Sequence, residues 1–171
     1  MNRNRKQFMK SLNFASPLVT INPGDDKKRG TEFENLVFEW FKGSDRFTDY
    51  TFSQKYRIYI GNPQKPHSVD VFGVENEGRA TLAAECRDFS RRKRSDDKNK
   101  IPYDEYAILN EAALFLSMTD CNFKYLIVRK TILKNSETLA GSYYRIYGHI
   151  LNRLNIKLAE FDNRTGTFSD I

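Results

Sequence analysis

The sequence predicts an α/β fold in which a central mixed β-sheet is flanked by helices. Segments with helical spacing of apolar residues alternate along the chain with short apolar strands, a pattern typical of helices covering a sheet. The length of 171 residues suffices for one domain with a proper core and is too short for two full ones. We therefore expect one α/β domain over residues 29–161, a basic arm over residues 1–28 and a loose tail over residues 162–171.

Charge and composition favour a soluble protein that binds nucleic acid. The net charge is +6, and the excess of Lys and Arg is concentrated in residues 1–30 and 87–100. Such basic segments suit a phosphate backbone, although a basic surface can also serve solubility alone. The sequence has no run near the ~20 apolar residues of a membrane helix and no apolar core of a secretory signal. Its two cysteines lack metal-ligand spacing, so we expect reduced thiols and an intracellular, cytoplasmic location.

The first regular element expected is an amphipathic helix over residues 31–42. Thr31 is a candidate N-cap, and Glu34 three residues later would complete a capping box. Glu34 also lies at the margin of the apolar stripe, from which it can reach a site at the sheet edge, and Glu32 is the second choice for that position. The stripe itself has helical spacing and comprises Phe33, Leu36, Val37, Trp40 and Phe41.

Strands are expected next. Residues 46–60 alternate loosely between apolar and polar, which predicts one long strand or a bent pair. Residues 61–66 contain Gly and two Pro and predict a loop. Residues 68–74 and 80–86 then predict two short apolar strands, joined by a turn at residues 76–78.

The second half of the chain predicts two helices, each followed by a strand. The first helix covers residues 103–118, and Pro102 suits its first turn. Residues 123–129 form a continuous apolar run, typical of a strand buried on both faces. Helical spacing returns over residues 137–154, and residues 156–161 predict the last strand.

Two carboxylates attract attention because each lies inside an apolar strand. These are Asp70 and Glu85, on the two strands that the turn joins. Burying a carboxylate is costly unless it binds a cation, and two that converge suit Mg²⁺, which prefers oxygen ligands. The chain continues after Glu85 into a basic run that suits a phosphate backbone: Arg91, Arg92, Lys93 and Arg94. The alternative is that both carboxylates form ion pairs with arginines of the fold.

The order of these residues resembles the core motif of the PD-(D/E)XK nuclease superfamily, which has the restriction-endonuclease-like fold. In that family an Asp on one strand precedes Asp/Glu-x-Lys on the next, and an upstream helical Glu often joins them. Asp70, Glu85 and Glu34 match these positions. Residues 29–36 look like the opening helix of archaeal Holliday-junction resolvases and Mrr-like restriction enzymes. The sequence departs from the pattern at Arg87, which takes the place of the Lys.

The resemblance implies a metal-dependent DNA endonuclease. Asp70 and Glu85 would bind Mg²⁺, for which Mn²⁺ would substitute, and Glu34 would complete the site directly or through water. Arg87 would stabilise the charge that develops on the phosphate, because an arginine stays protonated and does not act as a base.

The DNA partner would be held by the basic run, Arg91, Arg92, Lys93 and Arg94. His67 would touch a phosphate or the metal-bound water, unless it is simply solvated. The arm over residues 1–28 would either order on DNA or cover an edge strand. A homodimer is a further expectation, because many proteins of this fold are dimers.

Two alternatives of other classes stay open. A cleavage-inactive relative would bind DNA without metal and never cut it, and Arg87 would be the sign of its lost catalysis. A basic interaction protein would have carboxylates that serve only as structural ion pairs, and metal would not stabilise it.

Overall fold

The computed structural model describes residues 23–89, 102–133 and 135–171. Its helices are α2 (Pro23–Gly43), the short 3₁₀ helix η1 (Asp45–Phe47), α3 (Tyr103–Ser117) and α4 (Leu139–Arg153). Its strands are β1 (Tyr50–Ile60), β2 (Lys65–Glu75), β3 (Thr81–Arg87), β4 (Phe123–Arg129), β5 (Ile156–Asp162) and β6 (Thr167–Asp170).

The six strands form one mixed sheet in which they lie in the order of the sequence. Strands β1, β2 and β3 pair antiparallel, β3, β4 and β5 pair parallel, and β6 returns antiparallel to β5. The parallel pairs are the ones whose connections contain helices, as parallel pairing requires. The prediction of an α/β domain with a central mixed sheet flanked by helices is therefore confirmed.

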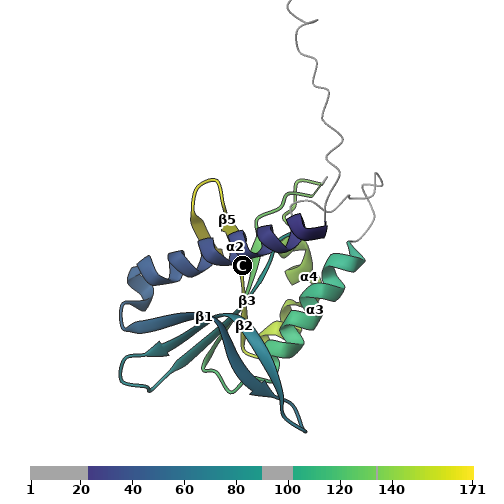
Figure 1. Ribbon diagram of the computed structural model, residues 1–171. Helices are drawn as coiled ribbons and strands as arrows, with labels where there is room; N and C mark the ends of the chain where they lie inside the picture. The colour runs from purple at the N-terminus through teal and green to yellow at the C-terminus, as the bar shows by residue number, and fades with distance from the viewer. Residues whose placement is uncertain (1–22, 90–101, 134) are drawn as a thin grey trace, which may run out of the picture.

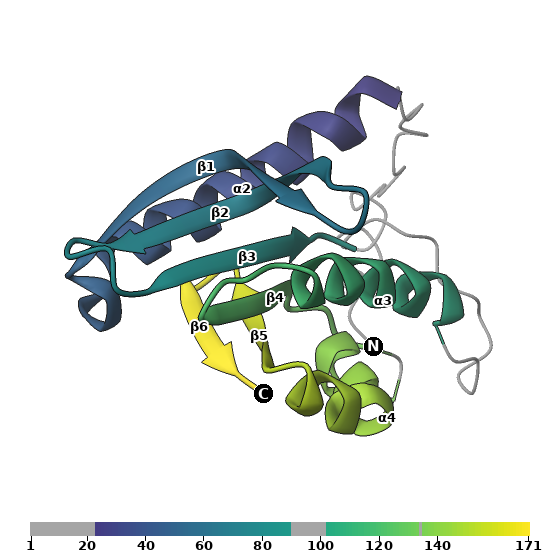
Figure 2. The ribbon, with the colours of Figure 1, turned by 90° about the horizontal axis from the view of Figure 1, so that it is seen from below.

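The sheet has one helical layer on each face. Figures 1 and 2 show α2 on one side of the sheet and α3 with α4 on the other. The central strand β4 is buried on both faces: Tyr125 and Ile127 pack in the α2 layer, while Leu126 and Val128 pack in the opposite layer. This alternation has the period of two that a strand imposes. The apolar run of β4 is therefore continuous because the strand is buried on both faces, as predicted.

The beginning of the first helix was predicted wrongly. Helix α2 begins at Pro23, whose fixed φ suits a first turn, so the predicted boundary at residue 28 falls inside a helix. Thr31 lies within α2 and is not its N-cap, which rules out the capping-box interpretation of Glu34. The upstream part of α2 is polar and so lacks the apolar periodicity from which helices are recognised. Within the predicted stripe, Leu36 is 45% exposed, whereas Phe33, Val37 and Phe41 are buried.

The prediction of a loose tail over residues 162–171 was also wrong. Strand β6 pairs with β5 from Asp162↔Thr167 to Ala159↔Asp170. Phe168 on β6 stacks on the indole of Trp40 from α2, with 4.0 Å between ring centroids. The tail has a single apolar residue in its strand, so its signal is weak in sequence and its order comes from this contact with a distant helix.

The remaining elements follow the predictions closely. Residues 46–60 divide into η1 and the single long strand β1. Helix α4 begins after Thr138, whose hydroxyl accepts a hydrogen bond from the backbone N–H of Gly141. Both cysteines are free thiols. Among the helices of the described ranges, none combines the length and apolar character that crossing a membrane requires.

The stacking of Phe168 on Trp40 predicts a loss of stability on truncation. Phe168→Ala removes a half-buried ring and should lower the free energy of unfolding by about 2 kcal/mol, less than the ~3–5 kcal/mol of a fully buried aromatic. Urea unfolding followed by the fluorescence of Trp40, the one tryptophan of the chain, measures this directly. Ser169→Ala, at the exposed neighbouring position, is the control. Equal stability of both variants and the wild type would contradict the packed position of β6.

Candidate active site

The two predicted strand carboxylates converge on one guanidinium. Asp70 on β2 and Glu85 on β3 are buried, with side chains 7% and 3% exposed. Arg87 donates from Nη1 to Asp70 Oδ2 at 3.3 Å and from Nη2 to Glu85 Oε2 at 2.9 Å. Asp70 Oδ2 also accepts a hydrogen bond of 2.8 Å from the backbone N–H of Cys86. The sequence correctly indicated that these carboxylates lie together, and both pair with Arg87, as the alternative of ion pairs with arginines of the fold predicted.

Glu34 reaches the same network from α2, through a lysine that the sequence did not single out. The ammonium of Lys55 on β1 lies 2.6 Å from Glu34 Oε2 and 2.6 Å from Asp70 Oδ1. Lys55 thus links the helix to β2 and brings a lysine amine to the carboxylates, although the position two residues after Glu85 holds Arg87. The expectation that Glu34 faces the sheet from the margin of its helix agrees with this contact.

The backbone of β1 turns Lys55 toward α2. Before Lys55, Phe52 packs in the α2 layer and Gln54 donates to the side chain of Asn35 on α2. After it, Tyr56 stacks on Phe72, which belongs to the opposite layer. Residues two apart in a strand normally share a face, so the side-chain alternation of β1 shifts at Lys55. Its φ of +51° lies in the left-handed region, which is uncommon outside glycine. This break in the extended backbone explains the shift.

Strand β2 shifts its alternation at the facing position. Val69 packs in the layer of α3 and α4, whereas Val71, two residues later, packs in the layer of α2. Between them lies Asp70, which stands opposite Lys55 because Gln54 pairs with Val71 and Tyr56 pairs with Val69. The two shifts occur side by side on neighbouring strands. Residues held in sparsely populated backbone conformations cluster at functional sites, so the positive φ of Lys55 agrees with a site at this position.

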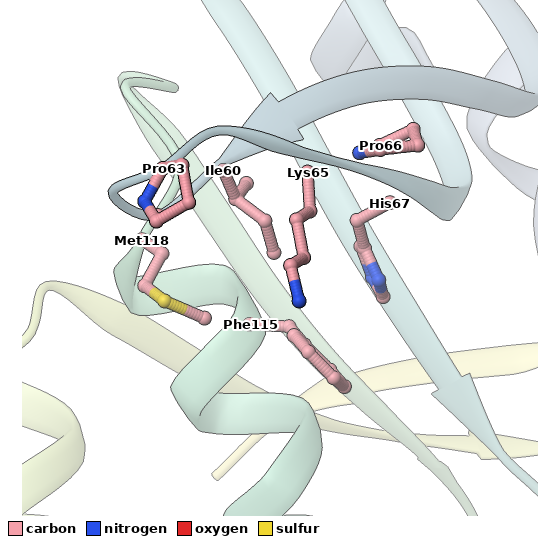
Figure 3. A pocket seen from close by; sticks show the side chains of 8 residues that line it. Ile60, Pro63, Lys65, Pro66, His67, Phe115 and Met118 are labelled. Carbon is pink, nitrogen blue, oxygen red and sulfur yellow. The ribbon is translucent and has the colours of Figure 1, made fainter.

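His67 closes the network on the side of α3. Its Nε2 lies 2.8 Å from Glu85 Oε1, and its ring stacks on Phe115 of α3 with 4.2 Å between centroids. The alternative of a simply solvated histidine is therefore wrong, because the side chain is 19% exposed and has two partners. His67 also lines a pocket of about 370 Å³ (Figure 3), whose other lining residues include Lys65, Ile60, Pro63, Phe115 and Met118.

Burial and charge shift the acidities of the site. Burial and the neighbouring Asp70 raise the pKa of Glu85, while Arg87 and His67 oppose that increase. Burial lowers the pKa of Lys55, but its hydrogen bond to Asp70 and its ion pair with Glu34 outweigh burial, so the pKa is raised overall. Burial and the surrounding carboxylates raise the pKa of the Cys86 thiol well above its usual value. Cys86 therefore stays protonated near neutral pH and is a poor nucleophile.

The oxygen atoms of the site are of the type that a hard divalent cation prefers, but nitrogen groups of the protein already contact them. In the described part of the chain, no three His, Cys, Asp or Glu side chains are arranged to hold a metal ion. Each carboxylate oxygen of Asp70 and of Glu85 contacts a nitrogen donor of the protein. Asp70 Oδ2, Glu85 Oε2 and the carbonyl oxygen of Cys86 nevertheless all face Arg87, as three oxygens would face a metal.

Part of the predicted DNA contact falls outside the described residues. The basic run of Arg91, Arg92, Lys93 and Arg94 lies between two described ranges, and residues 1–22 of the arm precede the first described range. The basic run follows β3 in the chain, and β3 carries Glu85 and Arg87. Its role in binding DNA stays a prediction.

Comparison with known proteins gives structural similarity at low sequence identity. No family model and no curated protein matches the sequence. One solved structure similar to this chain is a crystal structure of an XisH family protein from Nostoc punctiforme. The alignment covers 81% of this chain and 98% of that one, with 12% sequence identity and a TM-score of 0.48.

The raised pKa of Lys55 predicts a specific alkaline effect. A cation with a raised folded-state pKa contributes stability that is complete below its ordinary pKa of about 10.5 and is lost as pH rises through the folded-state value. The free energy of unfolding of the wild type, minus that of Lys55→Met, should therefore fall above pH ~10.5. Urea unfolding at a series of pH values measures it. The control is Lys42→Met on the surface of α2, and a pH-independent difference for Lys55→Met would contradict the pairing.

Proposed function

We propose that the protein is a metal-dependent DNA endonuclease of the restriction-endonuclease-like kind, in which Lys55 supplies the lysine that is missing after Glu85. The observation that carries the proposal is the position of the Lys55 ammonium, 2.6 Å from both Asp70 Oδ1 and Glu34 Oε2. Arg87 made cleavage doubtful from the sequence alone, because it replaces the expected lysine. Lys55 would bring a lysine ammonium to the same carboxylates from β1, where it could orient water or stabilise charge.

The carboxylates would hold the metal. Asp70 and Glu85 would bind Mg²⁺ or Mn²⁺, with Glu34 completing the set directly or through water. Such an ion polarises the phosphate and lowers the pKa of a bound water, which supplies the nucleophile for hydrolysis. His67 would position the Glu85 carboxylate through the 2.8 Å contact of its Nε2.

The cations of the site would stabilise charge more than move protons. The pKa of Lys55 is raised, so its ammonium stays protonated near neutral pH and would orient water or stabilise the charged phosphate as a donor. Arg87 would act in the same way, because a guanidinium does not lose its proton in proteins. Neither group is suited to act as general base in the state that the structure describes.

The charge of the chain supports a nucleic-acid substrate, and DNA is the one that we propose. The net charge is +6, and a cluster of four basic residues follows β3 closely in the sequence. Binding through such residues releases counterions, so affinity should fall steeply with salt concentration.

A cleavage-inactive DNA-binding protein is the second candidate, and the position of Arg87 favours it. Its guanidinium contacts an oxygen of each strand carboxylate, where a metal would need them free. If Arg87 never leaves, the site is a permanent ion-pair network. Such a protein would bind DNA equally well with and without a divalent metal.

Cleavage of supercoiled plasmid and of a branched DNA with Mg²⁺ or Mn²⁺ tests the proposal. We expect metal-dependent nicking that falls by at least ~10²-fold in Asp70→Asn, in Glu85→Gln and in Lys55→Met, because each removes a charged group from the site. Lys42→Met on the surface of α2 should cut like the wild type. Wild-type cutting with full activity in Lys55→Met would reject the role of that amine. DNA binding in EDTA without cutting under either metal would support the inactive alternative.

A further inference from the structure

The guanidinium of Arg87 lies where three oxygen atoms of the site converge. Its Nη1 is 2.7 Å from the carbonyl oxygen of Cys86 and 3.3 Å from Asp70 Oδ2, and its Nη2 is 2.9 Å from Glu85 Oε2. Two of these oxygens are anionic, and the side chain of Arg87 is 23% exposed. The convergence is local in sequence as well, because all but Asp70 belong to three consecutive residues of β3. This oxygen set therefore already encloses one cation.

The chemistry of arginine explains why it fills this position. A guanidinium is planar, always charged, and presents several donors in a fixed fork, so one group can satisfy oxygens in different directions. The ammonium of Lys55 meets the other oxygen of Asp70, Oδ1, together with Glu34. The two cations of the site are thus divided between the two oxygens of Asp70. Displacing Arg87 would leave the contacts of Lys55 in place.

We propose that Arg87 is an internal cation that occupies the position of a divalent metal in the metal-free protein and leaves it when the metal binds. The inference rests on the proposed function, because it concerns the same metal site. It adds a regulatory property of this chain: the site is closed by its own side chain until a competing cation opens it. Once displaced, the guanidinium is free to pair with a phosphate.

The competition has a measurable consequence for metal affinity. If Arg87 leaves the three oxygens free in only a fraction of the molecules, the apparent affinity for metal is reduced by that fraction. Replacing Arg87 by an uncharged side chain removes the competitor and should strengthen metal binding. This prediction is opposite in sign to the usual expectation for a residue that helps to build a metal site.

Mn²⁺ binding to the full-length chain tests the inference without any DNA. We expect Arg87→Met to bind Mn²⁺ at least ~10-fold tighter than the wild type, as measured by the electron paramagnetic resonance signal of free Mn²⁺. The matched control is Arg57→Met, which removes an exposed arginine from β1 and should bind Mn²⁺ like the wild type. The double variant Asp70→Asn with Arg87→Met should lose the gain, which locates the ion. Binding by Arg87→Met no tighter than by the wild type would overturn the inference, as would a gain that survives Asp70→Asn.

A second variant covers the case in which Arg87→Met does not fold, since it leaves two buried carboxylates without their counter-charge. Arg87→Lys keeps a positive charge but replaces the planar fork by a compact ammonium, so it should hold the three oxygens less completely. We expect folded Arg87→Lys to bind Mn²⁺ about threefold tighter than the wild type, and equal or weaker binding would overturn the inference.

The outcomes for this inference and for the nuclease are separable. Tighter Mn²⁺ binding by the Arg87 variants, with no cleavage by the wild type under Mg²⁺ or Mn²⁺, supports Arg87 as the occupant and rejects the endonuclease. Cleavage by the wild type with no gain in Mn²⁺ affinity in the variants supports the endonuclease and rejects Arg87 as the occupant.

Discussion

The buried carboxylate of Asp70 is the group on which the rest of the site depends. Its Oδ1 pairs with Lys55 from β1, and its Oδ2 accepts from the backbone of Cys86 and from Arg87 on β3. Lys55 carries the connection on to Glu34 of α2. A buried charge that loses its partner costs about 3–5 kcal/mol, so these contacts fix three strands and a helix relative to one another. The positive φ of Lys55 is costly by itself, at ~1–3 kcal/mol, and its two carboxylate contacts can offset that cost.

The balance of charge distinguishes the two candidate functions. Three carboxylates, from Glu34, Asp70 and Glu85, face the fixed cations Lys55 and Arg87, and His67 contacts Glu85. Without a metal, two protein cations therefore offset most of the negative charge of the three carboxylates. In a metal-dependent nuclease, one of these side-chain cations must give its place to a metal ion, whereas a protein that only binds DNA has no such need. Arg87 is the cation in question, because its three oxygen partners are those that would surround a metal.

Much of this arrangement could be predicted from the sequence, and the failures have physical causes. Asp70 and Glu85 were found because a carboxylate inside an apolar strand is conspicuous, and adjacent strands bring them together. Lys55 was missed because strand alternation predicts side-chain direction only where the backbone is regular, and β1 departs from regularity at that residue. Strand β6 was missed because its order depends on the contact of Phe168 with Trp40, which is distant in sequence. The direction of the Arg87 side chain depends on rotamer and partners, which a motif does not encode.

A crystal structure of the protein soaked with Mn²⁺, with anomalous scattering to locate the ion, tests the central claim most directly. The account predicts an ion bound to Asp70 Oδ2 and Glu85 Oε2, with Arg87 turned away and Lys55 still in contact with Glu34 and Asp70. If Arg87 keeps its contacts with both carboxylates and no ion is bound beside them at high Mn²⁺ concentration, the metal-dependent account is contradicted. The site would then be a permanent ion-pair network.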